Sequence, residues 1–338
     1  MKTLFLAFLL VLMPIAYAHH SHANLDRDNV QQHTGVVTKY SWRMPHVFLQ
    51  VQGPNQAGDL VNWSIELLHP AGMIQWGWGQ DTFNPGDRIT WEGAVDKNPN
   101  RHYSGLHWAE KADGTRLYNL GSGHTRVEAP VAPSTDFTGL WVRDRRSGFH
   151  YEPRADWPYS ERARALVASF DETQNPQLDC ENPGPPKSTF LPYPIRISRP
   201  DQGVIVLDYE MRDQQRVFRL GQDVVAAAPS KTGQSRAWME GDELVVETAN
   251  FVADRWGSFT GVDSSEQKQL LERFSLIEDG LTLRIQMTLT DPVYLTEPVD
   301  VDYYMRKVAD RELLSANCTL ESARLFVEAG YENPGVTR

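Results

Sequence analysis

The stretch "GVVTKYSWRMPHVFLQV", residues 35–51, alternates apolar and polar residues on both sides of a Met-Pro dipeptide. Alternation with a period of two is typical of strands that bury one face, and proline is rare inside a sheet. The stretch therefore predicts two strands of a β domain, joined by a turn around Pro45.

Three residues of this stretch stand two positions apart: Trp42, Met44 and His46. On one continuous strand they would share a face, and a thioether, an imidazole and an aromatic ring together suit Cu(I). The alternative, which we favour, packs Trp42 in a core and makes residues 44–46 a turn. On that interpretation, His46 is a single candidate ligand at a strand end.

Short alternating runs continue to about residue 112, with turn residues between them. One segment, "HPAGMIQWGWG" at 69–79, starts with a proline suited to a first helical turn and ends in glycines. Four or five strands and one short helix predict a small barrel of OB type. The runs are "VNWSIEL" at 61–67, "DRITWEGAV" at 87–95 and "GLHWAEKA" at 105–112.

This region resembles DUF6152, a family of exported bacterial proteins of unknown function. Its members carry a His-His-Ser motif after the signal, followed by Gly-x-Val-Thr and then Asn-Pro-His. Here the corresponding motifs are "HHSHA" at 19–23, "GVVT" at 35–38 and "MPH" at 44–46, with Met44 where asparagine is more frequent. The resemblance implies one domain over residues 19–120 and leaves its function open.

Residues 1–18 carry one early lysine, an apolar run and the ending Ala-Tyr-Ala, which is the pattern of a cleaved secretory signal. We therefore expect a periplasmic or secreted protein with no integral membrane segment after cleavage. An uncleaved anchor is the alternative. The formal net charge of −11 argues against nucleic acid as a partner, since phosphate binding needs clustered positive charge. A small molecule or a metal ion is the expected partner.

Cleavage after Ala18 would expose an α-amine beside three imidazoles, those of His19, His20 and His22. Such nitrogen donors suit Cu(II), and His46 could add a ligand from a strand. Our first functional hypothesis is therefore a non-enzymatic periplasmic binding protein with a copper site at these four histidines. The alternative is that the terminal histidines bind metal only adventitiously.

Residues 121–136 are rich in Gly, Ser and Pro, which predicts a linker before a second β domain over 137–338. A serine-capped helix is expected at 160–170. The motif "FTGLW" at 137–141 is similar to the Gly-x-Trp of lipocalins, which implies a barrel with Trp141 on its floor and Arg306 packed across it. A β-sandwich or an open meander is the alternative.

The chain has 10 tryptophans and 12 tyrosines, which could line an apolar pocket or simply fill β cores. Our second functional hypothesis is an enzyme or carrier, of isomerase, hydratase or lyase type, for a small apolar substrate in the second domain. Trp141, Tyr304 and Arg306 are its predicted ligand-binding residues. The sequence carries no phosphate loop, dinucleotide fingerprint or Gly-x-Ser-x-Gly motif, so it does not decide between catalysis and binding.

Two cysteines, Cys180 and Cys318, predict one disulfide in an exported chain, although two buried thiols remain the alternative. Their surroundings, "DCENPG" and "ANCTLE", are similar to those in a recurrent, uncharacterised domain of exported bacterial proteins. A bridge over so long a loop would stabilise the fold by about 4 to 5 kcal/mol in the chain-entropy model.

Overall fold

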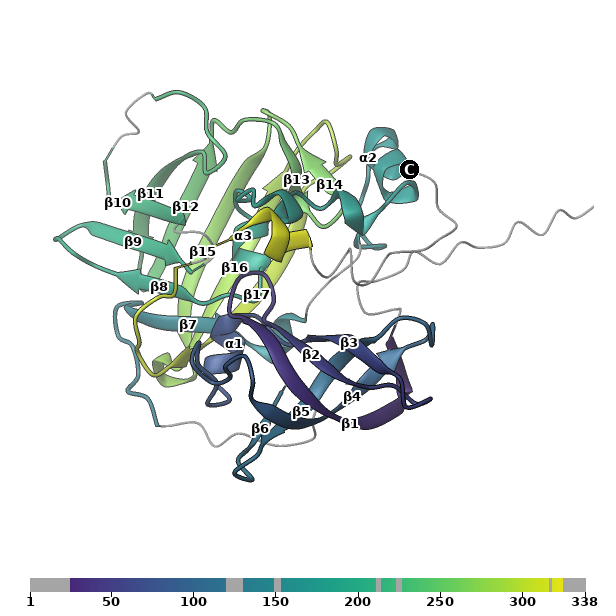
Figure 1. Ribbon diagram of the computed structural model, residues 1–338. Helices are drawn as coiled ribbons and strands as arrows, with labels where there is room; N and C mark the ends of the chain where they lie inside the picture. Colours follow the sequence, from purple (N-terminus) through teal and green to yellow (C-terminus); the bar gives the residue numbers. More distant parts are fainter. Residues whose placement is uncertain are drawn as a thin grey trace, which may run out of the picture.

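The computed structural model describes residues 25–119, 130–148, 153–210, 214–222, 227–315 and 318–324. Over these ranges the chain is mainly β and forms two large sheets, the first from residues 25–118 and the second from 139–308. Figure 1 shows them as two adjoining bodies, the smaller in purple and blue and the larger in teal to yellow-green. The mainly β fold expected from the alternating runs is confirmed.

The smaller body is a closed ring of strands. The strand order is β3-β2-β1-β4-β5-β6, and β3 also pairs in parallel with β5, which closes the ring as a small OB-like barrel requires. The short helix follows β3, as predicted. Its elements are β1 (Leu25–Ser41), β2 (Phe48–Pro54), β3 (Leu60–Glu66), α1 (Pro70–Ile74), β4 (Arg88–Asp96), β5 (Tyr103–Lys111) and β6 (Arg116–Tyr118).

The bend between β1 and β2 comprises residues 42–47. Trp42 packs against the core of the smaller barrel. Met44 is instead buried against Leu191 and Tyr193, which belong to the larger body. The turn interpretation is thus confirmed, and the three residues do not form one face of a strand.

The larger body is an antiparallel meander that nearly closes on itself. Its order is β10-β9-β8-β7-β17-β16-β15-β12-β11, and a bridge between Leu220 and Ala237 joins the two edge strands. The sheet is therefore nearly closed and barrel-like, consistent with the expected barrel or sandwich, and we refer to it as the larger barrel. The strands are β7 (Gly139–Arg143), β8 (Ile195–Ser198), β9 (Val204–Tyr209), β10 (Gln214–Arg219), β11 (Gln234–Glu240), β12 (Glu243–Ala249), β15 (Gln269–Ile277), β16 (Thr282–Thr290) and β17 (Val299–Val308).

Shorter elements interrupt this meander. Helix α2 begins where predicted, because the Ser160 hydroxyl accepts a hydrogen bond from the Ala163 amide. Helix α3 contacts β13, and α2 contacts β14 (Figure 1). The shorter elements are η1 (Arg145–Ser147), α2 (Glu161–Ala168), η2 (Glu172–Gln174), η3 (Pro176–Asp179), α3 (Lys187–Phe190), β13 (Asp254–Phe259), β14 (Val262–Ser264) and η4 (Glu278–Gly280).

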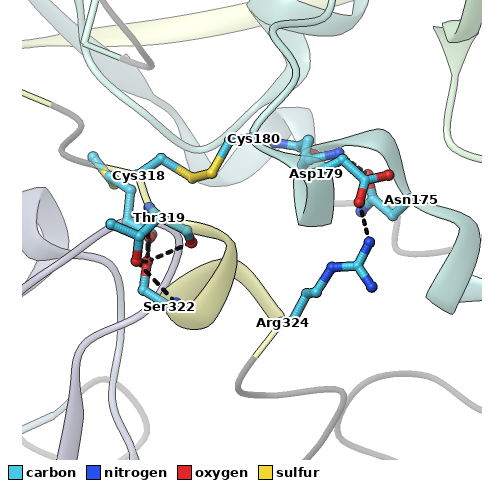
Figure 2. Close-up of a disulfide and its surroundings, with 9 residues drawn as sticks. Asn175, Asp179, Cys180, Cys318, Thr319, Ser322 and Arg324 are labelled. Carbon is cyan, nitrogen blue, oxygen red and sulfur yellow. Dashed lines mark hydrogen bonds and ion pairs between the residues drawn. A yellow bond between two sulfur atoms is a disulfide. The ribbon is translucent and has the colours of Figure 1, made fainter.

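A disulfide links Cys180, at the end of η3, to Cys318, as predicted (Figure 2). The turn that follows Cys318 reaches the smaller barrel, where the Ser322 hydroxyl donates to the Met44 carbonyl at 3.1 Å. Nearby, the ammonium of Lys39 pairs with Glu321 at 2.6 Å. The disulfide therefore anchors a segment that contacts both barrels.

The end of the predicted linker belongs to the larger barrel. The Ser134 amide donates to the Gly280 carbonyl, and Phe137 is part of the barrel core. Over the parts of the chain that the structure describes, no helix has the length and apolar character needed to cross a membrane.

Candidate functional site

A pocket opens in the larger barrel between β17, the β13–β14 hairpin and the segment that links β7 to β8. Its volume is about 60 Å³, which is room for about four water-sized groups. The inner walls are Trp157, Lys187, Phe190, Phe259 and Tyr303, and Thr260 lies beside them.

Aromatic rings form one continuous wall of this pocket. The Phe259 ring lies 5.0 Å from that of Trp157 and 5.5 Å from that of Phe190, measured between centroids. Phe190 in turn lies 5.5 Å from the ring of Tyr303. Such rings offer a ligand apolar surface, so the polar groups among them determine which ligand fits.

Lys187, the first residue of α3, is only 7% exposed. Its Nζ donates to the Thr260 hydroxyl at 2.5 Å and lies 5.6 Å from the centroid of Phe259. Among the described residues, no carboxylate lies within ion-pair distance of this nitrogen. Burial lowers the pKa of Lys187 to about 7, against a smaller opposing effect of Glu172. Charged and neutral forms therefore coexist near neutral pH.

Tyr303 supplies a second polar group to the pocket. Its side chain is 3% exposed, and its hydroxyl has no hydrogen-bond partner in the described part of the chain. Burial raises the pKa of Tyr303, so the hydroxyl stays protonated and can donate. A buried hydroxyl without a partner costs about 1 to 3 kcal/mol. A water or a ligand oxygen in the pocket would remove that cost.

Charged residues lie toward the outside of the pocket. Arg154 pairs with Asp156 at 2.6 Å, and Asp302 pairs with Arg284 at 2.8 Å. Arg154 and Asp302 are thus already paired with opposite charges of the protein, whereas the buried Lys187 has no such carboxylate partner among the described residues. The pocket thus combines a polar edge with an apolar interior that contains one amine and one phenol.

The three predicted ligand-binding residues do not line this pocket. Trp141 is fully buried in the barrel core, where its indole nitrogen donates to the Phe137 carbonyl at 2.8 Å. In the pairing of β7 with β17, Lys307 lies opposite Trp141, and Arg306 lies opposite Val142. Because faces alternate along a strand, Arg306 points to the other side of the sheet from Trp141, which corrects the expected packing.

Tyr304 also lies on the other side of the sheet from the pocket. Its ring centroid is 4.8 Å from the guanidinium of Arg146, whereas the adjacent Tyr303 is buried against the interior. The burial of Val299, Tyr303 and Met305 follows a period of two along β17. That alternation could have selected Tyr303 from the sequence.

Lys187 gave no signal in the sequence, because "PGPPKSTF" at 183–190 has the composition of an exposed turn. The structure instead buries Lys187, Ser188 and Thr189 between the barrel and β13. Tertiary packing therefore creates this site, and local sequence does not reveal it.

His46 lies at the bend of the smaller barrel beside a buried carboxylate. Its Nδ1 is 3.0 Å from Glu66 Oε1 and 3.2 Å from the Leu67 carbonyl oxygen. Glu66 also accepts a hydrogen bond from the Tyr103 hydroxyl. Burial and then the Glu66 charge raise the pKa of Tyr103. These contacts fix the orientation of the imidazole.

The neighbouring His69 is held neutral. Its Nδ1 accepts from the Gly72 amide at the start of α1, and its ring meets that of Tyr193 edge-on at 4.8 Å. Burial lowers the pKa of His69 to about 3, with smaller effects of His46, Arg143 and Arg311 in the same direction.

The structure bears only partly on the copper hypothesis. His19, His20 and His22 lie outside the described residues, so their role stays a prediction. Within the described ranges, His46 is not part of any group of three or more His, Cys, Asp or Glu side chains placed to hold a metal ion.

Residues 8–106 match the model of DUF6152, a family of unknown function. Neither curated proteins nor solved structures gave a match to the chain. The pocket around Lys187 lies in the larger barrel and therefore outside the matched residues. The smaller barrel, from its first strand into β5, is thus similar to the DUF6152 family, as its motifs predicted.

Proposed function

We propose that the larger barrel binds a small molecule with a short apolar body and one oxygen acceptor, a carboxylate or a carbonyl group. One observation carries the proposal: Lys187 and Tyr303, whose hydroxyl has no hydrogen-bond partner among the described residues, line one cavity together with the rings of Trp157, Phe190 and Phe259. This function corresponds to the carrier alternative of the second sequence hypothesis.

The electrostatics favour an acceptor over a donor ligand. A buried ammonium without a carboxylate partner is costly, and so is a buried hydroxyl without an acceptor. A ligand oxygen would satisfy both groups, and an anion would also raise the pKa of Lys187 back toward its usual value. A ligand cation would meet Lys187 as a like charge and be rejected.

The size of the cavity favours a short ligand. Room for about four water-sized groups suits a short linear ligand of about five or six heavy atoms, and the rings of Trp157, Phe190 and Phe259 would surround its apolar part. Butyrate, a carboxylate on a propyl group, is therefore a suitable probe, and butylammonium is a linear ligand of similar length with the opposite charge.

The test is calorimetric titration of the full, disulfide-bonded chain with butyrate and with butylammonium at pH 6.5. Butyrate should bind and butylammonium should not. Because hydrogen bonds to charged groups contribute about 1.5 to 3 kcal/mol, Lys187→Met should weaken butyrate binding about tenfold or more.

Two neighbouring tyrosines give a matched pair of variants. Tyr303→Phe should also weaken butyrate binding about tenfold or more, because it removes a hydrogen bond to the charged carboxylate, which contributes about 1.5 to 3 kcal/mol. Tyr304→Phe, on the other side of the sheet, should leave it unchanged. Equal affinities in the wild type and all three variants would refute the proposal, and so would equal binding of butylammonium.

A further inference from the structure

Lys187 meets the structural needs of an amine that reacts with carbonyl compounds. Its side chain lines a cavity, its one described hydrogen bond goes to the Thr260 hydroxyl, and its nitrogen lies over the ring of Phe259. Exclusion of water from around an amine favours the neutral, nucleophilic form. Burial alone does not decide the matter, because the chain contains a second buried lysine.

Lys268 provides the comparison. It is 1% exposed, and burial lowers its pKa to about 8. Its Nζ, however, donates to the carbonyls of Pro185 and Gly257 at 3.0 and 3.3 Å, and it lies 4.2 Å from the centroid of Phe251. It does not line the pocket. The Lys268 ammonium thus donates to two backbone carbonyls, whereas Lys187 lines the pocket.

We infer that Lys187 forms a reversible imine with a small aldehyde or ketone that occupies the pocket. The inference rests on the proposed binding function: a carbonyl ligand that binds in the pocket would then react with Lys187. A carbonyl ligand would place its oxygen toward the Tyr303 donor and its electrophilic carbon toward the amine.

The reaction balances without an oxidant or a reductant. The amine lone pair forms a C–N bond while the carbonyl π electrons move to oxygen, which takes a proton from Tyr303. The nitrogen then passes one proton, with Thr260 as the adjacent relay, to that oxygen, and the C–O bond breaks as water leaves and the nitrogen lone pair forms the C=N bond of an iminium. The iminium returns its remaining N–H proton to Tyr303, so the net change is carbonyl compound plus amine to imine plus water.

The test is reduction of the imine in the full chain. Butanal is added at pH 7 with cyanoborohydride for short times, and the butylated lysines are identified by peptide mass spectrometry. Lys187 should be modified at least about tenfold faster than exposed Lys39, since an ordinary lysine is almost entirely protonated at this pH. Excess butyrate should suppress modification of Lys187 but not of Lys39.

Three variants locate the reaction. Lys187→Arg keeps the charge but cannot form the imine, so it should lose the fast adduct. Lys187→Met should lose both the fast adduct and butyrate binding, and Lys268→Met should retain both. All are checked for folding by circular dichroism.

The outcomes separate the two proposals. If butyrate binds to the wild type but Lys187 is butylated no faster than Lys39, the imine inference is overturned and the binding function stands. If Lys187 is butylated rapidly in a butyrate-sensitive way, both stand. If neither binding nor fast modification occurs, both fail.

Discussion

At the residue scale, the ionisation of Lys187 links the pocket to stability. Burial holds the pKa of the Lys187 amine at about 7 in the folded protein, against an ordinary value of 10.5 for an exposed lysine. Between these values the unfolded chain binds a proton that the folded chain does not. Raising the pH through this window therefore removes a penalty on folding and stabilises the protein.

This reasoning gives the first prediction. Relative to Lys187→Met, the wild-type free energy of unfolding should rise by about 1.4 kcal/mol for each pH unit between 7 and 10. Urea unfolding at several pH values measures the difference in the free energy of unfolding between the wild type and Lys187→Met. The contributions of other titrating groups, such as Lys268, are common to both proteins and cancel in this difference. Curves that stay parallel over this range would show that the Lys187 pKa is unshifted.

His69 should act in the opposite pH range. Its pKa falls from 6.5 to about 3 on folding, so the unfolded chain takes up a proton first as the pH drops. Acid therefore destabilises the fold through His69 from about pH 6.5 down to about 3. His69→Asn, whose side chain can still accept from the Gly72 amide, should reduce this loss. The measurement is the decrease in the thermal unfolding temperature between about pH 6.5 and 3. An equal decrease in the wild type and in His69→Asn would contradict this role of His69.

At the scale of elements, the position of α3 depends on the chain just before it. A methyl group at Gly184 would lie 1.9 Å from the Lys231 carbonyl oxygen, and the preceding Pro183 carbonyl accepts from Gln214 at 3.0 Å. Backbone contacts on both sides thus fix the segment that carries Lys187. A side chain at Gly184 would force that segment to shift.

Gly184→Ala is therefore expected to destabilise the protein by about 1 to 3 kcal/mol and to weaken butyrate binding. Gly79→Ala is the control, because no heavy atom lies within 4 Å of the added methyl group. Thermal unfolding and titration calorimetry of both variants measure the effects. Wild-type affinity in Gly184→Ala would indicate that the approach of α3 to the barrel is not needed for the site.

The elements also show what the sequence could predict. Alternation placed the strands of both barrels, and the serine cap placed the start of α2, because these signals are local. Alternation also separates Tyr303, which shares a face with Val299, Val301 and Met305, from Tyr304. The burial of Lys187 follows from the docking of α3 against β13, which is a contact between distant segments and leaves no local pattern.

The bend at residues 42–47 illustrates the same limit. The proline signalled a turn, yet the position of Met44 against Leu191 and Tyr193 depends on how the two barrels meet. Similarly, the sequence favoured His46 as a candidate ligand but gave no indication that Glu66 and Tyr103 surround it.

At the scale of the whole molecule, the disulfide joins distant parts of the chain. The bridge spans 138 residues between Cys180 and Cys318, and the turn beyond it contacts Met44 and Lys39 of the smaller barrel. Figure 2 also shows Arg324 of this turn paired with Asp179, next to Cys180. The bridge thus constrains the unfolded chain and holds the turn that contacts both barrels.

Replacement of both cysteines by serine should lower the free energy of unfolding by about 5 kcal/mol on the chain-entropy model. The loss should be accompanied by faster amide hydrogen exchange in the turn at 318–324 and in the bend at 42–47. Urea unfolding and hydrogen exchange of the double variant measure both effects. An unchanged free energy of unfolding and unchanged amide hydrogen exchange would show that the disulfide constrains neither the unfolded chain nor the folded protein.

The central claim is that the cavity around Lys187 and Tyr303 is a ligand site. Its most direct test is a crystal structure of the full chain with 3-bromopropionate, in which anomalous scattering locates the bromine. The account predicts a bromine peak among Trp157, Phe190 and Phe259, with the carboxylate in contact with Lys187 Nζ and the Tyr303 hydroxyl. A cavity that holds only ordered water at saturating ligand, with bromine elsewhere or nowhere, would contradict it.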